Sequence, residues 1–163
     1  MREISVSATV ERTCSASPEA ILAWERDPFA VASVDTRTRV TGYVATDTLV
    51  GSRWTMVVTM AGFLRMREQQ SLMSLDPVIV ETRAPRQSGT LTVTARAVAD
   101  EDGGSEVTYR YALVLKLPPV SHLIYSRRTA GLQRKLSARL TEYVDKSVAA
   151  IEAHAAHEAT GAL

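Results

Sequence analysis

Residues 105–119 read SEVTYRYALVLKLPP, and residues 120–153 read VSHLIYSRRTAGLQRKLSARLTEYVDKSVAAIEA. The first stretch alternates with a period of two, which is typical of a half-buried strand. Pro118 and Pro119 end that pattern, and helical spacing follows. The change predicts a long C-terminal helix over 120–153, with Gly131 as a point where it is expected to bend or weaken. One apolar stripe of this helix is expected to pack on a sheet: Leu132, Leu136, Leu140, Tyr143, Val144, Val148 and Ile151.

The rest of the chain predicts that sheet. Residues 3–12 alternate strictly and form a first strand, and Ser17 and Pro18 suit the start of a short helical segment that ends near Asp27-Pro28. Six more strands are expected where the period stays near two, namely 37–45, 51–60, 63–74, 78–84, 90–99 and 105–116. The prediction is an α+β fold in which a seven-stranded curved antiparallel sheet wraps around the C-terminal helix, with short helices after the first strand.

Chain length, cysteine content, net charge and the length of apolar runs limit the classes of protein to which this chain can belong. The 163 residues predict a single domain over 1–154 and a flexible tail over 155–163. The lone Cys14 excludes an internal disulfide and favours a cytoplasmic setting. A net charge of +1 lacks the basic excess that is typical of a nucleic-acid-binding protein. No apolar run approaches the ~18 residues that a membrane-spanning helix needs. We therefore expect a soluble, unexported protein.

Four motifs mark turns and strand starts: SPEAILAW after the first strand, Gly51-Ser-Arg-Trp54, Leu75-Asp-Pro77, and Gly104-Ser-Glu-Val-Thr-Tyr109. Over residues 3–153 this arrangement resembles the SRPBCC superfamily, the helix-grip proteins of the START and birch-pollen-allergen group, including the polyketide cyclase/dehydrase family. The resemblance implies a largely apolar cavity between sheet and helix that holds a hydrophobic small molecule. It transfers no catalytic residue, because its motifs concern turns rather than chemistry.

Strand alternation predicts which side chains face that cavity. The inward rows of two strands supply the expected ligand-binding residues Trp54, Met56, Met60, Met66 and Gln70. Glu68 shares their face, where burial would raise its pKa and make it a candidate proton donor. The alternative is a β-bulge that returns Glu68 to solvent, or a structural hydrogen bond.

Two tyrosines and four polar helix residues complete the predicted site. Tyr109 and Tyr111 face inward, either toward a cavity or as core tyrosines with bonded hydroxyl groups. Four polar residues fall on the apolar sector of the helix, which suggests that its first half roofs the cavity: His122, Tyr125, Thr129 and Gln133. The alternative is a helix that begins later, with 119–126 as a solvated loop.

These residues support more than one function. An enzyme that cyclises, aromatises or dehydrates a polyketide-like substrate would use Glu68, Tyr109, Tyr111 and His122 as catalytic groups. The alternative is a non-enzymatic carrier of a lipid or other hydrophobic ligand, which needs no titrating group. A third possible function is docking to another protein. No cofactor is implied, and Glu68 and His122 are too few inward ligands for a metal site.

A basic stretch lies in the C-terminal helix: Arg127, Arg128, Arg134, Lys135 and Arg139. Such a stretch is usually a solvated face. In a cyclase it would instead meet an acyl carrier protein, because these carriers are acidic.

Overall fold

The computed structural model describes residues 1–60, 64–83 and 89–161. Its strands are β1 (Arg2–Cys14), β2 (Thr38–Val44), β3 (Arg53–Met60), β4 (Leu64–Leu75), β5 (Val78–Arg83), β6 (Gly89–Ala99) and β7 (Ser105–Leu117). Its helices are α1 (Pro18–Arg26), α2 (Pro28–Ser33), α3 (Pro119–Ser126) and α4 (Thr129–Gly161). The α+β helix-grip fold expected from the sequence is confirmed.

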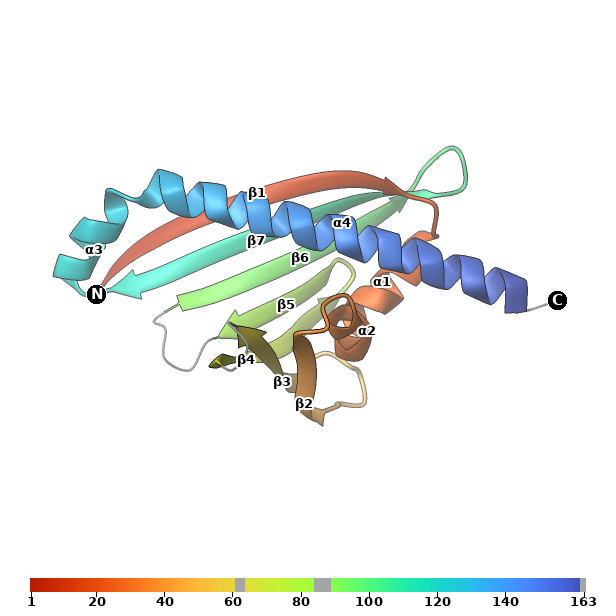
Figure 1. Cartoon of the computed structure of the whole chain (residues 1–163), viewed down its shortest axis with the longest axis horizontal. Coiled ribbons are helices and arrows are strands. Elements are labelled where there is room, and N and C mark those ends of the chain that lie inside the picture. The colour runs from red at the N-terminus through yellow and green to blue at the C-terminus, as the bar shows by residue number, and fades with distance from the viewer. Residues whose placement is uncertain (61–63, 84–88, 162–163) are drawn as a thin grey trace.

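The seven strands form one antiparallel sheet in the order β1-β7-β6-β5-β4-β3-β2. Figure 1 shows α4 crossing this sheet along the β1 side, with α1 and α2 beneath its C-terminal half. Ser17 caps α1 by accepting a hydrogen bond from the Ala20 amide, and Asp27 caps α2 in the same way at Phe29. These two helices fill the space between the sheet and α4, so they border the pocket described below.

The helix α4 is held against β1 and the residue that follows it by its apolar stripe and by polar contacts. Leu140 and Val144 are fully buried. Arg12 Nε donates to Asp145 Oδ1 at 2.9 Å, and the Ser15 amide donates to Glu152 Oε1 at 2.9 Å. The stripe predicted from helical spacing is therefore the face that packs on the sheet.

The C-terminal helical region differs from the single helix expected over 120–153. It breaks at Arg127 and Arg128 rather than bending at Gly131. At the break, Ser126 Oγ donates to the Leu123 carbonyl, and Thr129 Oγ1 donates to carbonyls of Tyr125 and Ser126. Such side-chain bonds compete with the helical hydrogen-bond ladder and favour a bend.

The other end of the helix also extends further than expected. Residues 155–161, which we place in a flexible tail, continue α4 to Gly161, and Ala155 packs against the core. Helical propensity explains this, since the segment has alanines and no proline. The domain boundary at residue 154 stays a prediction. No helix in the described ranges is long and apolar enough to cross a membrane.

Candidate functional site

A pocket of about 260 Å³ lies between the inner face of the sheet and the helices α1, α2 and α4. Its walls are largely apolar and include Met56, Val58, Val80, Leu91 and Val93. A second hollow of about 320 Å³ adjoins it and shares the lining residues Val34, Asp35, Val58, Glu68 and Tyr143. We call the second hollow the mouth of the pocket.

Glu25 is the most unusual group in the pocket wall. It lies on α1, four residues after the buried Ile21, and is itself only 6% exposed. Tyr109 OH donates to its Oε1 and Tyr143 OH to its Oε2, each at 2.8 Å. Burial raises the pKa of Glu25 to about 7, although both tyrosine hydrogen bonds act in the opposite direction. Near neutral pH the carboxyl group is therefore divided between its two protonation states.

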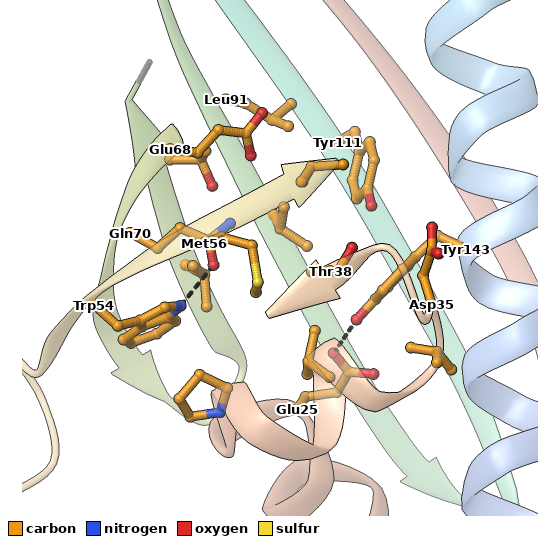
Figure 2. Close-up of a pocket in the computed structure, with 17 residues that line it drawn as sticks. Glu25, Asp35, Thr38, Trp54, Met56, Glu68, Gln70, Leu91, Tyr111 and Tyr143 are labelled. Atoms are coloured by element: carbon orange, nitrogen blue, oxygen red, sulfur yellow. Dashed lines mark hydrogen bonds between the residues drawn. The ribbon is translucent and has the colours of Figure 1, made fainter. Parts of the chain in front are cut away.

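The tyrosines around Glu25 remain protonated. Burial raises the pKa values of Tyr109, Tyr111 and Tyr143 above the usual range, and the nearby Glu25 charge adds to that rise. Tyr109 is fully buried, whereas Tyr111 and Tyr143 line the pocket. The hydroxyl groups of Tyr109 and Tyr143 thus donate to Glu25, and the Tyr143 bond lies at the pocket wall (Figure 2).

Glu68 lies on the opposite side of the pocket from Glu25 in Figure 2. It pairs with Met56 across β3 and β4, and the register shift of β4 falls beyond it, between Leu72 and Ser74. The alternative in which a bulge turns Glu68 to solvent is therefore not what the structure shows. Burial raises the pKa of Glu68, and the Arg139 charge opposes that rise.

The inward rows predicted for β3 and β4 are observed where the structure describes them. Trp54 and Met56 are buried, and Trp54 Nε1 donates to Gln70 Oε1 at 2.8 Å in the pocket wall. Met66 lines the mouth. The side chain of Met60 lies outside the described part of the chain, so its predicted role remains a prediction.

The mouth carries six charged side chains. Arg37 pairs with Asp35 and lowers the pKa of that carboxyl to about 2, and Lys146 pairs with Glu142 at 2.7 Å. Arg139 and Glu68 are the other two charged groups there. Of the five basic residues noted in the sequence, Arg139 is the one that lines the mouth.

The four polar helix residues do not line either hollow, which corrects our expectation that the first half of the helix roofs the cavity. The break at Arg127 places His122 and Tyr125 in α3, against the end of the sheet. Thr129 bonds to carbonyls of the preceding turn, and Gln133 Nε2 donates to the Ser7 carbonyl of the edge strand β1. The pocket lies further along, where Tyr143 faces the sheet.

Sequence reasoning missed Glu25 and treated Tyr143 as a packing residue. A signal for Glu25 was present, since Ile21, Leu22 and Glu25 share one face of α1 and a carboxylate on an apolar helix face is unusual. No spacing in the sequence indicates that Tyr109 and Tyr143, 34 residues apart, bond to the same carboxyl.

No group of three or more His, Cys, Asp or Glu side chains in the described ranges is placed to hold a metal ion. The polar groups of the pocket are instead carboxyl, hydroxyl and amide groups. These can donate, accept or transfer protons with a small organic molecule.

Neither a protein-family model nor a curated protein matches the sequence. Several solved structures share its architecture. A protein of unknown function from Staphylococcus aureus superimposes with a TM-score of 0.73 at 17% identity, over 94% of this chain and 98% of that one. The Zhui aromatase/cyclase from Streptomyces sp. R1128 has a TM-score of 0.61 at 13% identity, over 97% and 96%.

The di-domain ARO/CYC StfQ from the steffimycin biosynthetic pathway has a TM-score of 0.65 at 13% identity, over 96% of this chain and 52% of that one. Ara h 8.0201, a Bet v 1-like protein, has a TM-score of 0.61 at 13% identity, over 93% and 97%. The chain shares the helix-grip fold with these structures. This confirms, at the level of the fold, the resemblance that its turn and strand motifs indicate. Within this fold, the pocket chemistry of this chain comes from its own Glu25, Tyr143 and Glu68.

Proposed function

We propose that this protein binds a small, mainly apolar molecule with at least one polar group, and that Glu25, held by Tyr143, exchanges a proton with it. The observation that carries the proposal is a buried carboxyl with a pKa of about 7 in the wall of an apolar pocket, where it accepts a hydrogen bond from Tyr143. A carboxyl of this pKa combines a useful population of both protonation states with a strong driving force for proton transfer.

The size of the pocket limits the ligand. A cavity of ~150 Å³ accommodates a benzene molecule. The pocket, at about 260 Å³, therefore suits a molecule of one or two rings, and a longer chain would extend into the mouth past Glu68 and Arg139.

The predicted site residues take different parts in this proposal. Glu68 and Tyr111 would contact the ligand as hydrogen-bonding or acid-base groups from the sheet side, with Trp54, Met56 and Gln70 as the wall beside them. Tyr109 would hold Glu25 from behind as a positioning residue. His122 has no part in it, because it lies outside both hollows.

Cyclisation or dehydration of a polyketide-like substrate is the narrower form of this proposal. It is supported by the aromatase/cyclases among the structures that share the fold, and by a group that could remove a proton next to a carbonyl. In this form the substrate would be tethered to an acyl carrier protein and enter at Arg139. The alternative function, supported by the apolar walls alone, is carriage of a hydrophobic ligand without chemistry.

Binding can be tested by tryptophan fluorescence. Trp54 lines the pocket and Trp24 does not, so a Trp24→Phe variant leaves a single reporter. Titration with fatty acids, flavonoids and aromatic polyketides should give saturable quenching with at least one class. If no class quenches Trp54 while the variant remains folded by circular dichroism, the binding proposal fails.

Proton transfer can be tested on a free poly-β-ketone thioester analogue. Glu25→Gln should lower the rate of cyclisation by roughly 10²–10⁴-fold, the usual worth of a positioned acid or base. Tyr143→Phe should lower it too, because it removes a hydroxyl group that holds the Glu25 carboxyl at the pocket wall. Equal rates in the parent and Glu25→Gln proteins, with binding retained, would leave the carrier function as the better reading.

A further inference from the structure

The helix α3 exposes more apolar side chain than its amphipathic neighbours. Val120, Leu123 and Ile124 are 75%, 57% and 51% exposed, and Tyr125 is 44% exposed. Positions 120, 123 and 124 fall on one side of a helix, so these three side chains form a continuous outward face. None of the eight residues of α3 is buried. We call these four residues the α3 tip.

Basic side chains surround the α3 tip. Arg127 and Arg128 follow it directly and are exposed. The adjoining ends of β1 and β7 bring Arg2 and Lys116 to the same end of the sheet, where Glu3 is the acidic residue paired with Lys116 in register. From residue 107 to residue 141 the sequence contains no acidic residue.

The position of α3 lets this surface meet a flat partner. Figure 1 shows α3 at one end of the long axis of the molecule, beside the N-terminus and beyond the start of α4. The exposed Met1 lies at the same end. A plane could therefore contact the α3 tip and the adjoining ends of β1 and β7 at this end of the molecule.

We propose that the α3 tip is a peripheral binding site for anionic lipid bilayers, in which its apolar side chains enter the interface and Arg127 and Arg128 contact lipid phosphate groups. Apolar side chains beside lysine and arginine are the pattern that places a helix in an interface, with tyrosine at the headgroup level. Basic residues near a negatively charged leaflet add to the affinity.

A bilayer explains these observations better than a protein partner does. A stable protein interface buries ~800 Å² on each side and needs a complementary shape. An eight-residue helix at one end of the molecule offers a small surface, whereas a bilayer can adapt to the shape of the surface that it meets. The charge around α3 also matches a surface of uniformly negative headgroups.

The test is co-sedimentation of the full chain with two kinds of vesicle. One kind is phosphatidylcholine alone, and in the other about 30% of the lipid is phosphatidylglycerol, which gives a negative surface. We expect binding to the anionic vesicles that weakens as salt is raised, because salt screens exposed charge over ~8 Å at physiological ionic strength. A Leu123→Asp/Ile124→Asp variant and an Arg127→Glu/Arg128→Glu variant should each bind at least about tenfold more weakly.

Matched controls lie on the outer face of β6, toward the other end of the sheet. Val98 is 57% exposed, like Leu123, and Arg96 is an exposed arginine. Val98→Asp and Arg96→Glu should leave vesicle binding unchanged. The proposal is overturned if both vesicles bind equally, if neither binds, or if the α3 variants bind like their controls. It is also overturned if light scattering shows a dimer that the Leu123→Asp/Ile124→Asp variant dissociates, because α3 would then be a protein interface.

Discussion

The Glu25 carboxyl lies among apolar side chains on α1. The free energy needed to bury it depends on whether it is ionised. When it is protonated, its burial is tolerated; when it is ionised, the fold must hold a charge away from water. Two tyrosine hydroxyl groups offset part of that cost, yet the pKa remains raised, at about 7. The group therefore couples the stability of the protein to pH.

We predict that stability falls as pH rises through the range set by Glu25. The folded pKa of about 7 lies above the ordinary value of 4.5, so the contribution is fully present below about pH 4.5 and is lost as pH rises through 7. The loss amounts to about 3 kcal/mol by linkage. Urea unfolding of the parent and Glu25→Gln proteins from acidic to alkaline pH measures it, and parallel curves would contradict the assignment.

Glu68 should respond to a single neighbouring charge. Burial raises its pKa and Arg139 lowers it, so removing that charge with Arg139→Gln should raise the pKa of Glu68 further. Carboxyl carbon titration by NMR, with Glu68→Gln to assign the signal, measures the change. Arg134→Gln, an exposed residue on the same helix, is the control and should have no effect. An unchanged Glu68 titration in Arg139→Gln would place the two groups further apart than the structure has them.

Among the individual helices and strands, α4 contains a glycine, Gly131, at a position where the structure leaves room for a larger side chain. Gly131 has nothing within 4 Å of an added Cβ and lies within the first turn of α4. The sequence predicts a bend or weak point at this glycine, whereas the structure breaks the helix at Arg127 and Arg128, where hydroxyl groups bond to the backbone. Gly131 is thus a weak point of the helix without a structural requirement for glycine.

Gly131→Ala should therefore stabilise the protein by roughly 0.5–1 kcal/mol, because alanine loses less backbone entropy in a helix. Thermal and urea unfolding measure the change. A destabilised variant would show that Gly131 has a contact or a conformation that the structure does not contain.

In the turn between β6 and β7, unlike at Gly131, a glycine-to-alanine substitution should destabilise the protein. A Cβ at Gly104 would lie 2.5 Å from the Cys14 carbonyl oxygen, a backbone atom that cannot move aside as a side chain could. Gly104→Ala should destabilise the protein by about 1–3 kcal/mol, the range for overpacking. If unfolding shows Gly104→Ala to be as stable as Gly131→Ala, the close approach of this turn to β1 is incorrect.

At the scale of the whole molecule, the pocket exists because the sheet is wider than the helix that covers it. The helix α4 packs on β1, and α1 and α2 close part of the remaining space over the other strands. The apolar walls left between them form the pocket. An apolar cavity lowers the free energy of unfolding, and a ligand that binds in it raises that free energy.

A substitution that fills the pocket should weaken ligand binding without lowering the stability of the fold. Val93 lines the pocket from β6, and its neighbour Thr92 lies on the opposite face of the same strand. Val93→Phe should retain or slightly raise the melting temperature while weakening ligand binding at least about tenfold, because the ring takes the volume of the ligand. Thr92→Phe should leave binding unchanged. Loss of binding in both variants would indicate a general disturbance of the sheet rather than occupation of the pocket.

Local patterns in the chain predict the architecture of this protein. Period-two alternation places Trp54, Met56, Glu68 and Gln70 on one face, and the change of period after Pro118 yields the C-terminal helix. These patterns are local, since each depends on residues a few positions apart, and turn residues set where each strand ends. The fold class, the inward rows and the position of Glu68 are therefore readable from the chain.

Which groups meet in the pocket depends on how the helices and strands pack together. Glu25, Tyr109 and Tyr143 come from α1, β7 and α4, and both tyrosines donate to the glutamate because the helices close over a curved sheet. The break at Arg127 and Arg128 places His122 and Tyr125 on the separate helix α3, outside both hollows. Side chains far apart in sequence carry no shared periodic signal, so their contacts and the raised pKa of Glu25 arise only when the elements pack.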